Sequence, residues 1–162
     1  MPERTPAGDR RAYVGGLYDA HGATLYRYAV MLLADAIAAE DVIQQVFAAL
    51  LRHDVHLEQE AHYLRRAVRN ECYSWLRTRQ AAASVSAEIL EVIPGRASDP
   101  DQRIALDRAI RTLPAEQREV VHLHSFEGWT FQQIADASDT SINTVAARYR
   151  YALARLRQQL ST

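Results

Sequence analysis

The stretch from Gly128 to Arg157 constrains the fold most strongly, because its pattern predicts two helices joined by a tight turn. Thr130 stands at an N-cap position and Gln133 follows three residues later, which is the spacing of a capping box. The apolar periodicity then breaks around Asp139, one of the few non-glycine types that tolerates a left-handed backbone. Ser141 is placed to cap a second, longer helix. The stretch therefore predicts a helix-turn-helix.

The second helix of this pair has one face to bury and another that is free to contact a ligand. The face expected to be buried repeats at steps of three and four: Ile142, Val145, Tyr149, Ala152, Leu156 and Leu160. On or beside the other face lie the candidates for contact with duplex DNA: Ser141, Asn143, Thr144, Ala147, Arg148, Tyr151 and Arg155. Small polar residues and arginine in the first turns of a second helix suit a DNA major groove. The alternative is a bundle helix whose arginines form an ordinary solvated face.

Composition limits the partners that the chain can attract. The 162 residues are 48% hydrophobic, enough for one modest core or two small ones, and the net charge is −1. Any hold on phosphates must therefore come from local patches, and every basic residue is arginine because the sequence has no lysine. A lone cysteine, Cys72, excludes an internal disulfide and fits a reducing cytosol. No apolar run approaches the roughly 20 residues of a membrane span, so we expect a cytoplasmic protein.

The first half of the chain reads as three helices. Apolar periodicity predicts them over residues 10–33, 36–53 and 60–79, with Asp35 as the N-cap of the second. The second helix carries a polar face made of Glu40, Asp41, Gln44 and Gln45. The third has a stripe expected to be buried, consisting of Leu64, Val68, Cys72, Trp75 and Leu76.

A second stripe on the third helix combines cations with an aromatic ring. Arg65, Arg69, Tyr73 and Arg77 follow at strict steps of four, and Arg66 and Asn70 lie beside them. Phosphates attract guanidinium groups and an unstacked base stacks on a ring, so this combination suits single-stranded nucleic acid. The alternative is a solvated face with one half-buried tyrosine.

A change of composition separates the two halves. Residues 81–100 are small, polar and acidic, and residues 81–107 hold five acids and two arginines, a net charge of −3. Two further helices are expected over residues 101–112 and 114–125. The expected fold is therefore all-α, with two small helical domains over residues 10–80 and 101–162 joined by an acidic linker, 81–100, and with the helix-turn-helix in the second domain.

Catalytic and metal-binding patterns are missing from the sequence. It contains no glycine-rich phosphate loop, no pair of cysteines and no serine, histidine and aspartate order that suggests a nucleophile. The histidines at 53, 56, 62, 122 and 124 lack cysteine neighbours or a third well-spaced ligand, so we interpret them as surface or linker residues. We expect no cofactor, no metal and no enzymatic activity.

Three separated stretches together resemble one protein family, the small two-domain sigma factors of bacterial RNA polymerase called the extracytoplasmic-function (ECF) group, group 4 of the sigma-70 family. AEDVIQQVFAALLRH (39–53) is similar to the family's polymerase-binding helix, and AHYLRRAVRNECYSWLRTR (61–79) to its helix for the melted minus-ten element. LPAEQREVVHLHSFEGWTFQQIADASDTSINTVAARYRYALARLR (113–157) is similar to its minus-thirty-five module. The motifs occur in the family's order and spacing, over nearly all of residues 10–160.

The resemblance implies a transcription initiation factor whose partners are core RNA polymerase and promoter DNA, with an anti-sigma factor as an optional further partner. The clamp helices of the largest polymerase subunit are implied to meet Glu40, Asp41, Gln44, Gln45 and Phe47, and the flap of the second largest subunit is a further contact. The unwound strand is implied to meet Arg65, Arg66, Arg69, Asn70, Tyr73 and Arg77. The upstream duplex is implied to meet the candidates on the C-terminal helix.

The chain departs from the family pattern at a few positions. Gln45 replaces a frequent glutamate, Ser74 a frequent aspartate and Asp139 the usual glycine of the turn. Ala146 and Ala154 stand where lysine or arginine is usual, which predicts fewer phosphate contacts upstream.

Two other functions fit parts of the pattern. A transcriptional regulator with a sensing or dimerising N-terminal bundle would explain residues 128–157 but would leave the arginine stripe of the third helix unused. A sigma-like interaction module would hold a protein partner without reading a promoter.

Overall fold

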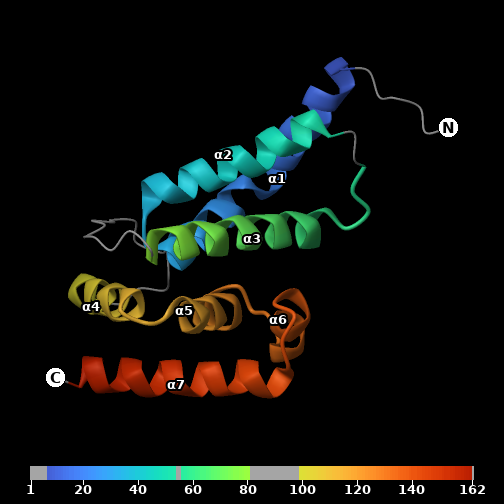
Figure 1. The fold of residues 1–162 in the computed structure, drawn as a ribbon. Coiled ribbons are helices and arrows are strands. Elements are labelled where there is room, and N and C mark those ends of the chain that lie inside the picture. The colour runs from blue at the N-terminus through green and yellow to red at the C-terminus, as the bar shows by residue number, and fades with distance from the viewer. Residues whose placement is uncertain (1–6, 54–55, 81–98, 162) are drawn as a thin grey trace. The chain divides into compact units, whose positions relative to one another are not determined.

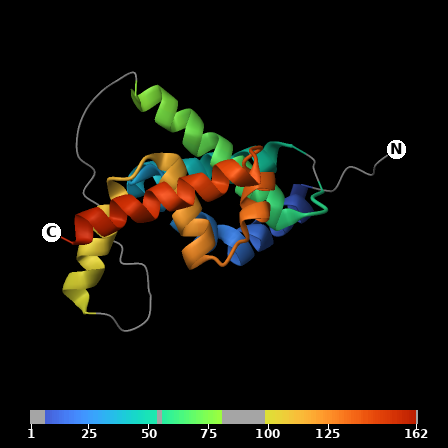
Figure 2. The ribbon, with the colours of Figure 1, turned by 90° about the horizontal axis from the view of Figure 1, so that it is seen from below.

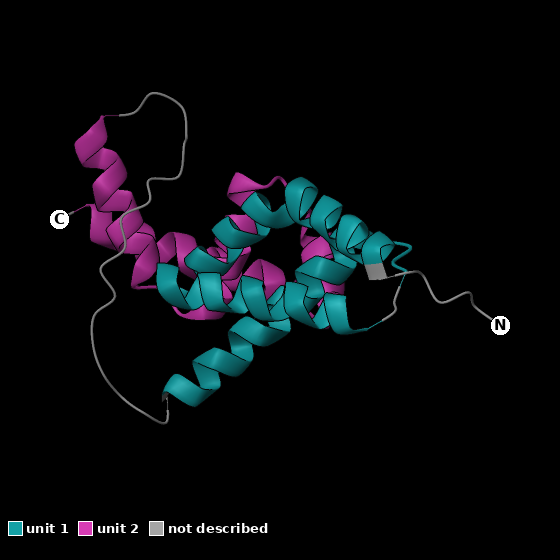
Figure 3. Cartoon of the chain, turned by 90° about the horizontal axis from the view of Figure 1, so that it is seen from above, with its two compact units in different colours: residues 1–86 teal, residues 87–162 magenta. Residues whose placement is uncertain are grey.

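The computed structural model describes residues 7–53, 56–80 and 99–161, which form two compact units with boundaries at residues 1–86 and 87–162 (Figures 1 and 3). Within the described residues, helices are the only regular secondary structure, which confirms the all-α fold. The expected linker lies outside the described residues except for its last two positions, 99 and 100. Each unit has its own core and is described by itself.

Unit 1 consists of α1 (Ala7–Leu33), α2 (Ala36–Arg52) and α3 (Glu60–Gln80), and all three helices pack on one another. Apolar side chains form the core where the three helices meet, with Leu32, Val42 and Val68 among its most buried members. Cys72 also lies in this core, with no exposed surface. The expected buried stripe of α3 is confirmed for Leu64, Val68 and Cys72, whereas Trp75 and Leu76 are half-buried.

The corner between α1 and α2 is fixed by Asp35. Ala34 turns the chain with a φ of 53°, and Asp35 then caps α2 by accepting a hydrogen bond from the Ala38 amide at 3.0 Å. The other carboxylate oxygen of Asp35 accepts from Arg79 on α3 at 2.8 Å. One side chain therefore joins the start of α2 to the end of α3.

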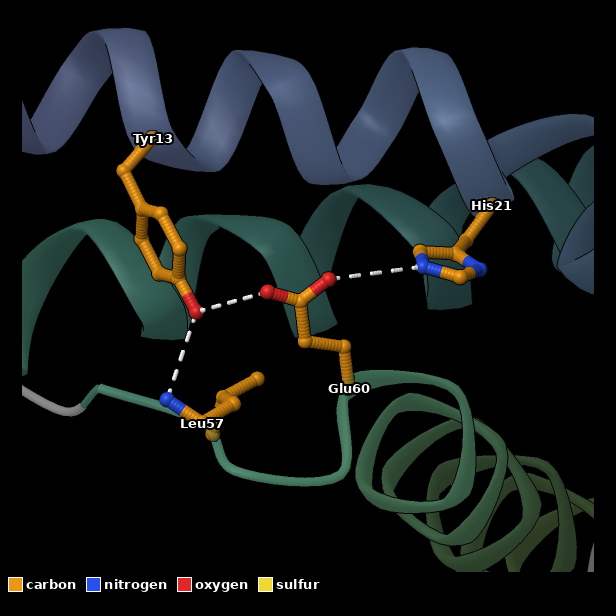
Figure 4. A network of polar contacts seen from close by, with 4 residues as sticks. All are labelled: Tyr13, His21, Leu57 and Glu60. Carbon is orange, nitrogen blue, oxygen red and sulfur yellow. Dashed lines mark hydrogen bonds and ion pairs between the residues drawn. The ribbon is translucent and has the colours of Figure 1, made fainter.

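A polar network ties the connection between α2 and α3 to α1 (Figure 4). The Tyr13 hydroxyl accepts a hydrogen bond from the Leu57 amide at 3.2 Å and donates to Glu60 Oε1 at 3.3 Å. The other oxygen of Glu60 lies 3.7 Å from His21 Nε2. Leu57 itself is buried, so the network anchors the residues just before α3 and sets where α3 begins.

Unit 2 consists of α4 (Pro100–Arg111), α5 (Ala115–Val121), the π-helix η1 (His122–Phe126), α6 (Phe131–Ala137) and α7 (Ile142–Leu160). Helices α4, α5 and α6 all pack on the long α7 (Figures 1 and 2). Residues 114–125, expected as one helix, are thus divided, because the last turn widens into a π-helix.

The structure corrects the expected role of His122. Its side chain is buried, and Nε2 lies 3.3 Å from Oε1 of Glu127, just after η1. It is therefore a core residue and not a surface histidine, because the wider π turn brings Glu127 back over it.

Two of the residues expected on the buried face of α7 are exposed. Val145, Ala152 and Leu156 are buried and Tyr149 is half-buried, but Ile142 and Leu160 are 43% and 48% exposed. They are the first and last residues of α7, where the neighbouring helices no longer cover it.

Candidate nucleic-acid and polymerase interfaces

The turn between α6 and α7 is built by local hydrogen bonds. Thr130 Oγ1 accepts from the Gln133 amide at 3.1 Å, and Gln133 Oε1 accepts from the Thr130 amide at 2.9 Å, so the expected capping box is present. Asp139 has a φ of 52°, the left-handed conformation that its residue type tolerates. Ser141 then accepts from the Thr144 amide at 3.1 Å and caps α7 as expected. These bonds fix the turn and the residue at which α7 begins.

An aromatic cluster holds α7 against the residues before it. The His124 ring lies 4.4 Å from the Phe131 ring and 4.9 Å from the Tyr149 ring, measured between centroids. His124 Nδ1 is 2.7 Å from the Trp129 carbonyl oxygen. The sequence pattern placed Tyr149 on the packed face, but the interpretation of His124 as a surface or linker residue is wrong, because its ring packs on partners from α6 and α7 that no local signal reveals.

The outward face of α7 forms a continuous stripe. Thr144, Arg148, Tyr151 and Arg155 follow at steps of four, three and four, which keeps them on one side of an α-helix. Tyr151 is 65% exposed, Ser141, Asn143 and Arg155 are exposed, and Thr144, Ala147 and Arg148 are half-buried. All the sequence candidates from Ser141 to Arg155 thus reach the surface at least in part. The name α7 face is used below for the stripe formed by Thr144, Arg148, Tyr151 and Arg155.

On α3 the exposed stripe differs from the one expected. The observed stripe, called the α3 face, consists of Arg66, Asn70, Tyr73 and Arg77, which are spaced by four, three and four residues. Tyr73 is half-buried and the other three side chains are exposed. Strict steps of four drift around a helix of 3.6 residues per turn, so residues 65, 69, 73 and 77 move gradually from the core to the surface.

The drift places Arg65 on the buried side of α3, so the expectation that Arg65 meets the unwound strand is wrong. Its side chain is only 7% exposed, and its guanidinium carbon lies 4.6 Å from the centroid of the buried Tyr28 ring. The residue stabilises the packing of α3 on α1 and offers no surface to a nucleic acid. Arg69 is intermediate: it is half-buried and lies 4.5 Å from the centroid of the Tyr73 ring, so it supports the ring at the edge of the α3 face.

The polar face of α2 is exposed, with one exception among the candidates. Glu40, Asp41, Gln44 and Gln45 are all at the surface, and they form the α2 polar face. Phe47 is only 7% exposed and packs edge-on against the Tyr18 ring at 5.2 Å. Phe47 is therefore a core residue, and the Tyr18 ring that packs on it is 55% exposed.

The electrostatics of unit 1 are perturbed at Asp35. Burial would raise the pKa of its carboxyl, but the hydrogen bond from the Ala38 amide and the hydrogen bond and charge of Arg79 outweigh it, so the pKa lies below its ordinary value. The Arg79 guanidinium in turn stacks over the Trp75 ring at 4.7 Å. The charged carboxylate thus orders the C-terminal turn of α3, next to the α3 face.

Other kinds of site are not formed by the described residues. Within residues 7–53, 56–80 and 99–161, no three His, Cys, Asp or Glu side chains come together as metal ligands would. Among the helices that the structure describes, none combines the length and the apolar character that a membrane span requires.

Comparisons with known proteins identify the family. The family model "Sigma-70 region 2" matches residues 17–82, and "Sigma-70, region 4" matches residues 103–156. The ECF RNA polymerase sigma factor SigL of Mycobacterium tuberculosis is 31% identical over 163 residues, which cover 95% of this chain and 92% of SigL. The chain belongs to the ECF sigma factors. SigM of the same organism is 28% identical to this sigma factor, over 96% of this chain and 82% of SigM.

Solved structures agree with this assignment. The sigma factor RpoE from Bartonella quintana, crystallised with the anti-sigma factor NepR, superposes with a TM-score of 0.67 at 25% identity, over 86% of this chain and 91% of RpoE. CnrH, in complex with the cytosolic domain of CnrY, superposes with a TM-score of 0.66 at 22% identity, over 96% of this chain and 92% of CnrH, and shows the shared fold.

Family membership confirms the function implied by the sequence motifs: the protein is a transcription initiation factor that directs RNA polymerase to promoters. Matches to both sigma regions do not favour a regulator with an N-terminal sensing bundle, because residues 17–82 match region 2.

Proposed function

We propose that this sigma factor divides its work among three surfaces. The α2 polar face docks on the clamp helices of the largest polymerase subunit, with the flap of the second largest subunit as a further contact. The α3 face receives the unwound non-template strand, and the α7 face enters the major groove of the minus-thirty-five duplex. Sigma factors catalyse no reaction of their own, and we expect the same of this protein, acting where polymerase acts, in the cytoplasm.

One observation carries this division: two helices of the chain have exposed stripes of the same spacing but different chemistry. The α3 face surrounds a half-buried ring with Arg66, Asn70 and Arg77, and its Tyr73 hydroxyl is buried, so the accessible part of Tyr73 is ring carbon that suits an unstacked base. The α7 face starts at a capped N-terminus with Thr144 and Arg148, which suits base edges and phosphates of a duplex.

Run-off transcription tests the proposal directly. Purified core polymerase with this chain should initiate at one position on a promoter of the encoding bacterium, whereas core alone should not. Core that binds the chain without specific initiation would point instead to a sigma-like interaction module. Failure of core to bind the chain would remove the proposal altogether.

An anti-sigma partner is the further element of this proposal. RpoE of Bartonella quintana was solved with such a partner, and it resembles this chain over most of its length. We propose that a protein of this class also controls the present sigma factor, and a pull-down of the tagged chain from its own bacterium, displaced by excess core polymerase, would detect it.

A further inference from the structure

Three rings from three different elements of unit 2 pack together. His124 of η1, Phe131 of α6 and Tyr149 of α7 form this aromatic cluster, and each of the three side chains is half-buried. The ring centroids lie 4.4 Å apart for His124 and Phe131, 4.9 Å apart for His124 and Tyr149, and 5.3 Å apart for Phe131 and Tyr149. These are contact distances for aromatic pairs, so every ring meets both of the others. The cluster therefore links both helices of the helix-turn-helix to η1.

The His124 ring is the member of the cluster that is bound to the main chain. Its Nδ1 lies 2.7 Å from the Trp129 carbonyl oxygen, and a carbonyl only accepts, so Nδ1 carries the hydrogen and donates it. The Trp129 amide in turn donates to the Leu123 carbonyl at 2.8 Å, across Gly128 with its φ of 74°. Two hydrogen bonds thus close the connection between η1 and α6, and one of them fixes the direction of the His124 ring.

Tyr149 transmits the position of that ring to α7. Its hydroxyl lies 3.3 Å from the Ser125 hydroxyl, and its ring meets the His124 ring at an interplanar angle of 77°. Apolar contacts such as those of the buried Ala152 are non-directional, whereas these two contacts resist rotation of α7 about its axis. Arg148 precedes Tyr149 directly, about 100° away around the helix, so the position of Tyr149 sets the direction of Arg148.

We infer that His124 is a positioning residue for recognition of the minus-thirty-five duplex, an inference that rests on the proposed function of the α7 face. Its ring fixes the rotation of α7 through Tyr149, and it contacts no DNA in this role. Readout of base edges needs side chains held within about 10–20° of their productive direction, which apolar packing alone secures poorly. His124 supplies that restraint from outside the helix-turn-helix.

Two reciprocal substitutions separate the ring from its hydrogen bond. His124→Asn removes the ring and keeps a donor for the Trp129 carbonyl, whereas His124→Phe keeps a ring and removes the donor. Thr130→Ala is the matched control, because it removes the cap of α6 and so destabilises unit 2 while leaving all three rings in place. Tyr149→Leu breaks the cluster from the side of α7 and decides the test if His124→Asn fails to fold. Circular dichroism of each full-length variant checks the fold.

The first measurement is the dependence of transcription on the upstream element. Run-off transcripts with core polymerase are compared between a promoter with an intact minus-thirty-five element and the same promoter with that element scrambled. We expect this ratio to fall about fivefold in His124→Asn and less than about twofold in His124→Phe and Thr130→Ala. Equal ratios in His124→Asn and Thr130→Ala would overturn the inference, because lost stability would then explain the defect. Failure of His124→Phe to rescue the ratio would overturn it as well.

The second measurement locates α7 on the DNA. Ala154 is exposed on α7 outside the α7 face, and Cys72 is buried, so an iron chelate coupled to Ala154→Cys labels α7 alone. Hydroxyl radicals from the chelate cut the promoter where α7 lies. In the core complex, His124→Asn should shift or spread the cuts, and Thr130→Ala should leave their positions unchanged. A merely structural role would weaken the cuts without moving them, and that result would overturn the inference.

The parent protein separates this inference from the proposed function. If transcription with the unsubstituted chain ignores the upstream element, and the chelate cuts no DNA there, the proposed role of the α7 face fails and the inference fails with it. If the unsubstituted chain depends on the element and cuts within it, while His124→Asn behaves like Thr130→Ala, only the inference fails.

Discussion

At the scale of single residues, Asp35 connects two helices through one carboxylate. Its carboxylate caps α2 and pairs with Arg79, whose guanidinium lies over Trp75. The cap and the ion pair are separate contributions to stability. They can be measured apart, because Asp35→Ala removes both whereas Asp35→Asn removes only the ion pair.

We expect Asp35→Ala to lower the free energy of unfolding of unit 1 by about 1 kcal/mol for the cap, with a few tenths more for the partly exposed ion pair. Asp35→Asn should retain the cap and lose only the ion pair. Urea unfolding followed by circular dichroism measures both.

The difference in stability between the wild type and Asp35→Asn should depend on pH. Because the folded pKa of Asp35 lies below its ordinary value of 3.8, the charge contributes stability that is fully present above about pH 3.8 and is lost as the pH falls through the folded pKa. The advantage of the wild type over Asp35→Asn should therefore shrink below that pH. An advantage that persists in more acidic solution would show that the ion pair is not its source.

Neighbouring arginines on α3 should behave in opposite ways. Arg65→Ala removes a buried cation from the Tyr28 ring and should destabilise unit 1 by about 2 kcal/mol. Arg66→Ala removes an exposed side chain and should leave stability within about 0.5 kcal/mol, while weakening binding of the core complex to forked promoter DNA. Equal stability of the two variants would contradict the burial of Arg65.

At the scale of the elements, local signals in the sequence predicted helix ends better than helix faces. Thr130, Asp35 and Ser141 cap helices as expected because a cap depends on residues three positions apart. Which side of α3 faces the solvent was predicted less well. A stripe with a strict spacing of four residues and a stripe with alternating spacings of four and three differ by only a fraction of a helical turn, and the choice between them depends on how α3 packs on α1 and α2.

The α3 face should act after the DNA has opened. Tyr73→Ala and Asn70→Ala should slow promoter opening more than they weaken the closed complex, because unstacked bases exist only after melting and stacking contributes on the order of 1–3 kcal/mol per base. Permanganate footprints of the melted region, compared with gel shifts of the closed complex at low temperature, measure the two steps. Footprints as strong as in the wild type would remove these residues from the strand-binding surface.

The α7 face allows a matched comparison within one helix. Arg148→Ala should weaken recognition of the minus-thirty-five element by about 1–3 kcal/mol if its guanidinium contacts a base edge. Arg150 is exposed on another side of α7, so Arg150→Ala is the control and should leave promoter selectivity unchanged. Transcription from promoters with altered upstream elements, together with core binding, measures the effect. Unchanged selectivity in Arg148→Ala would exclude this residue from the interface.

At the scale of the whole molecule, the two faces proposed to bind DNA are small and belong to separate units. The net charge of −1 gives the chain little long-range attraction to DNA, and a single helix-turn-helix contacts only a few base pairs. Core polymerase, docked on the α2 polar face, would hold both units at a fixed spacing and raise the effective concentration of each DNA contact.

We therefore expect the isolated protein to bind its promoter weakly and core polymerase to make that binding specific. Gel shifts and footprints with and without core measure the difference. Tight, sequence-specific binding by the isolated chain, especially as a dimer on a palindrome, would contradict it.

The burial of Cys72 has a practical consequence for such measurements. The single thiol of the chain has no exposed surface, so alkylating reagents reach it only when α3 separates from its neighbours. Its alkylation rate in native buffer therefore measures how often unit 1 opens. A cysteine introduced at an exposed position such as Ala20 or Tyr151 would react first, so a fluorophore pair, one on each unit, could follow their separation as polymerase and promoter are added.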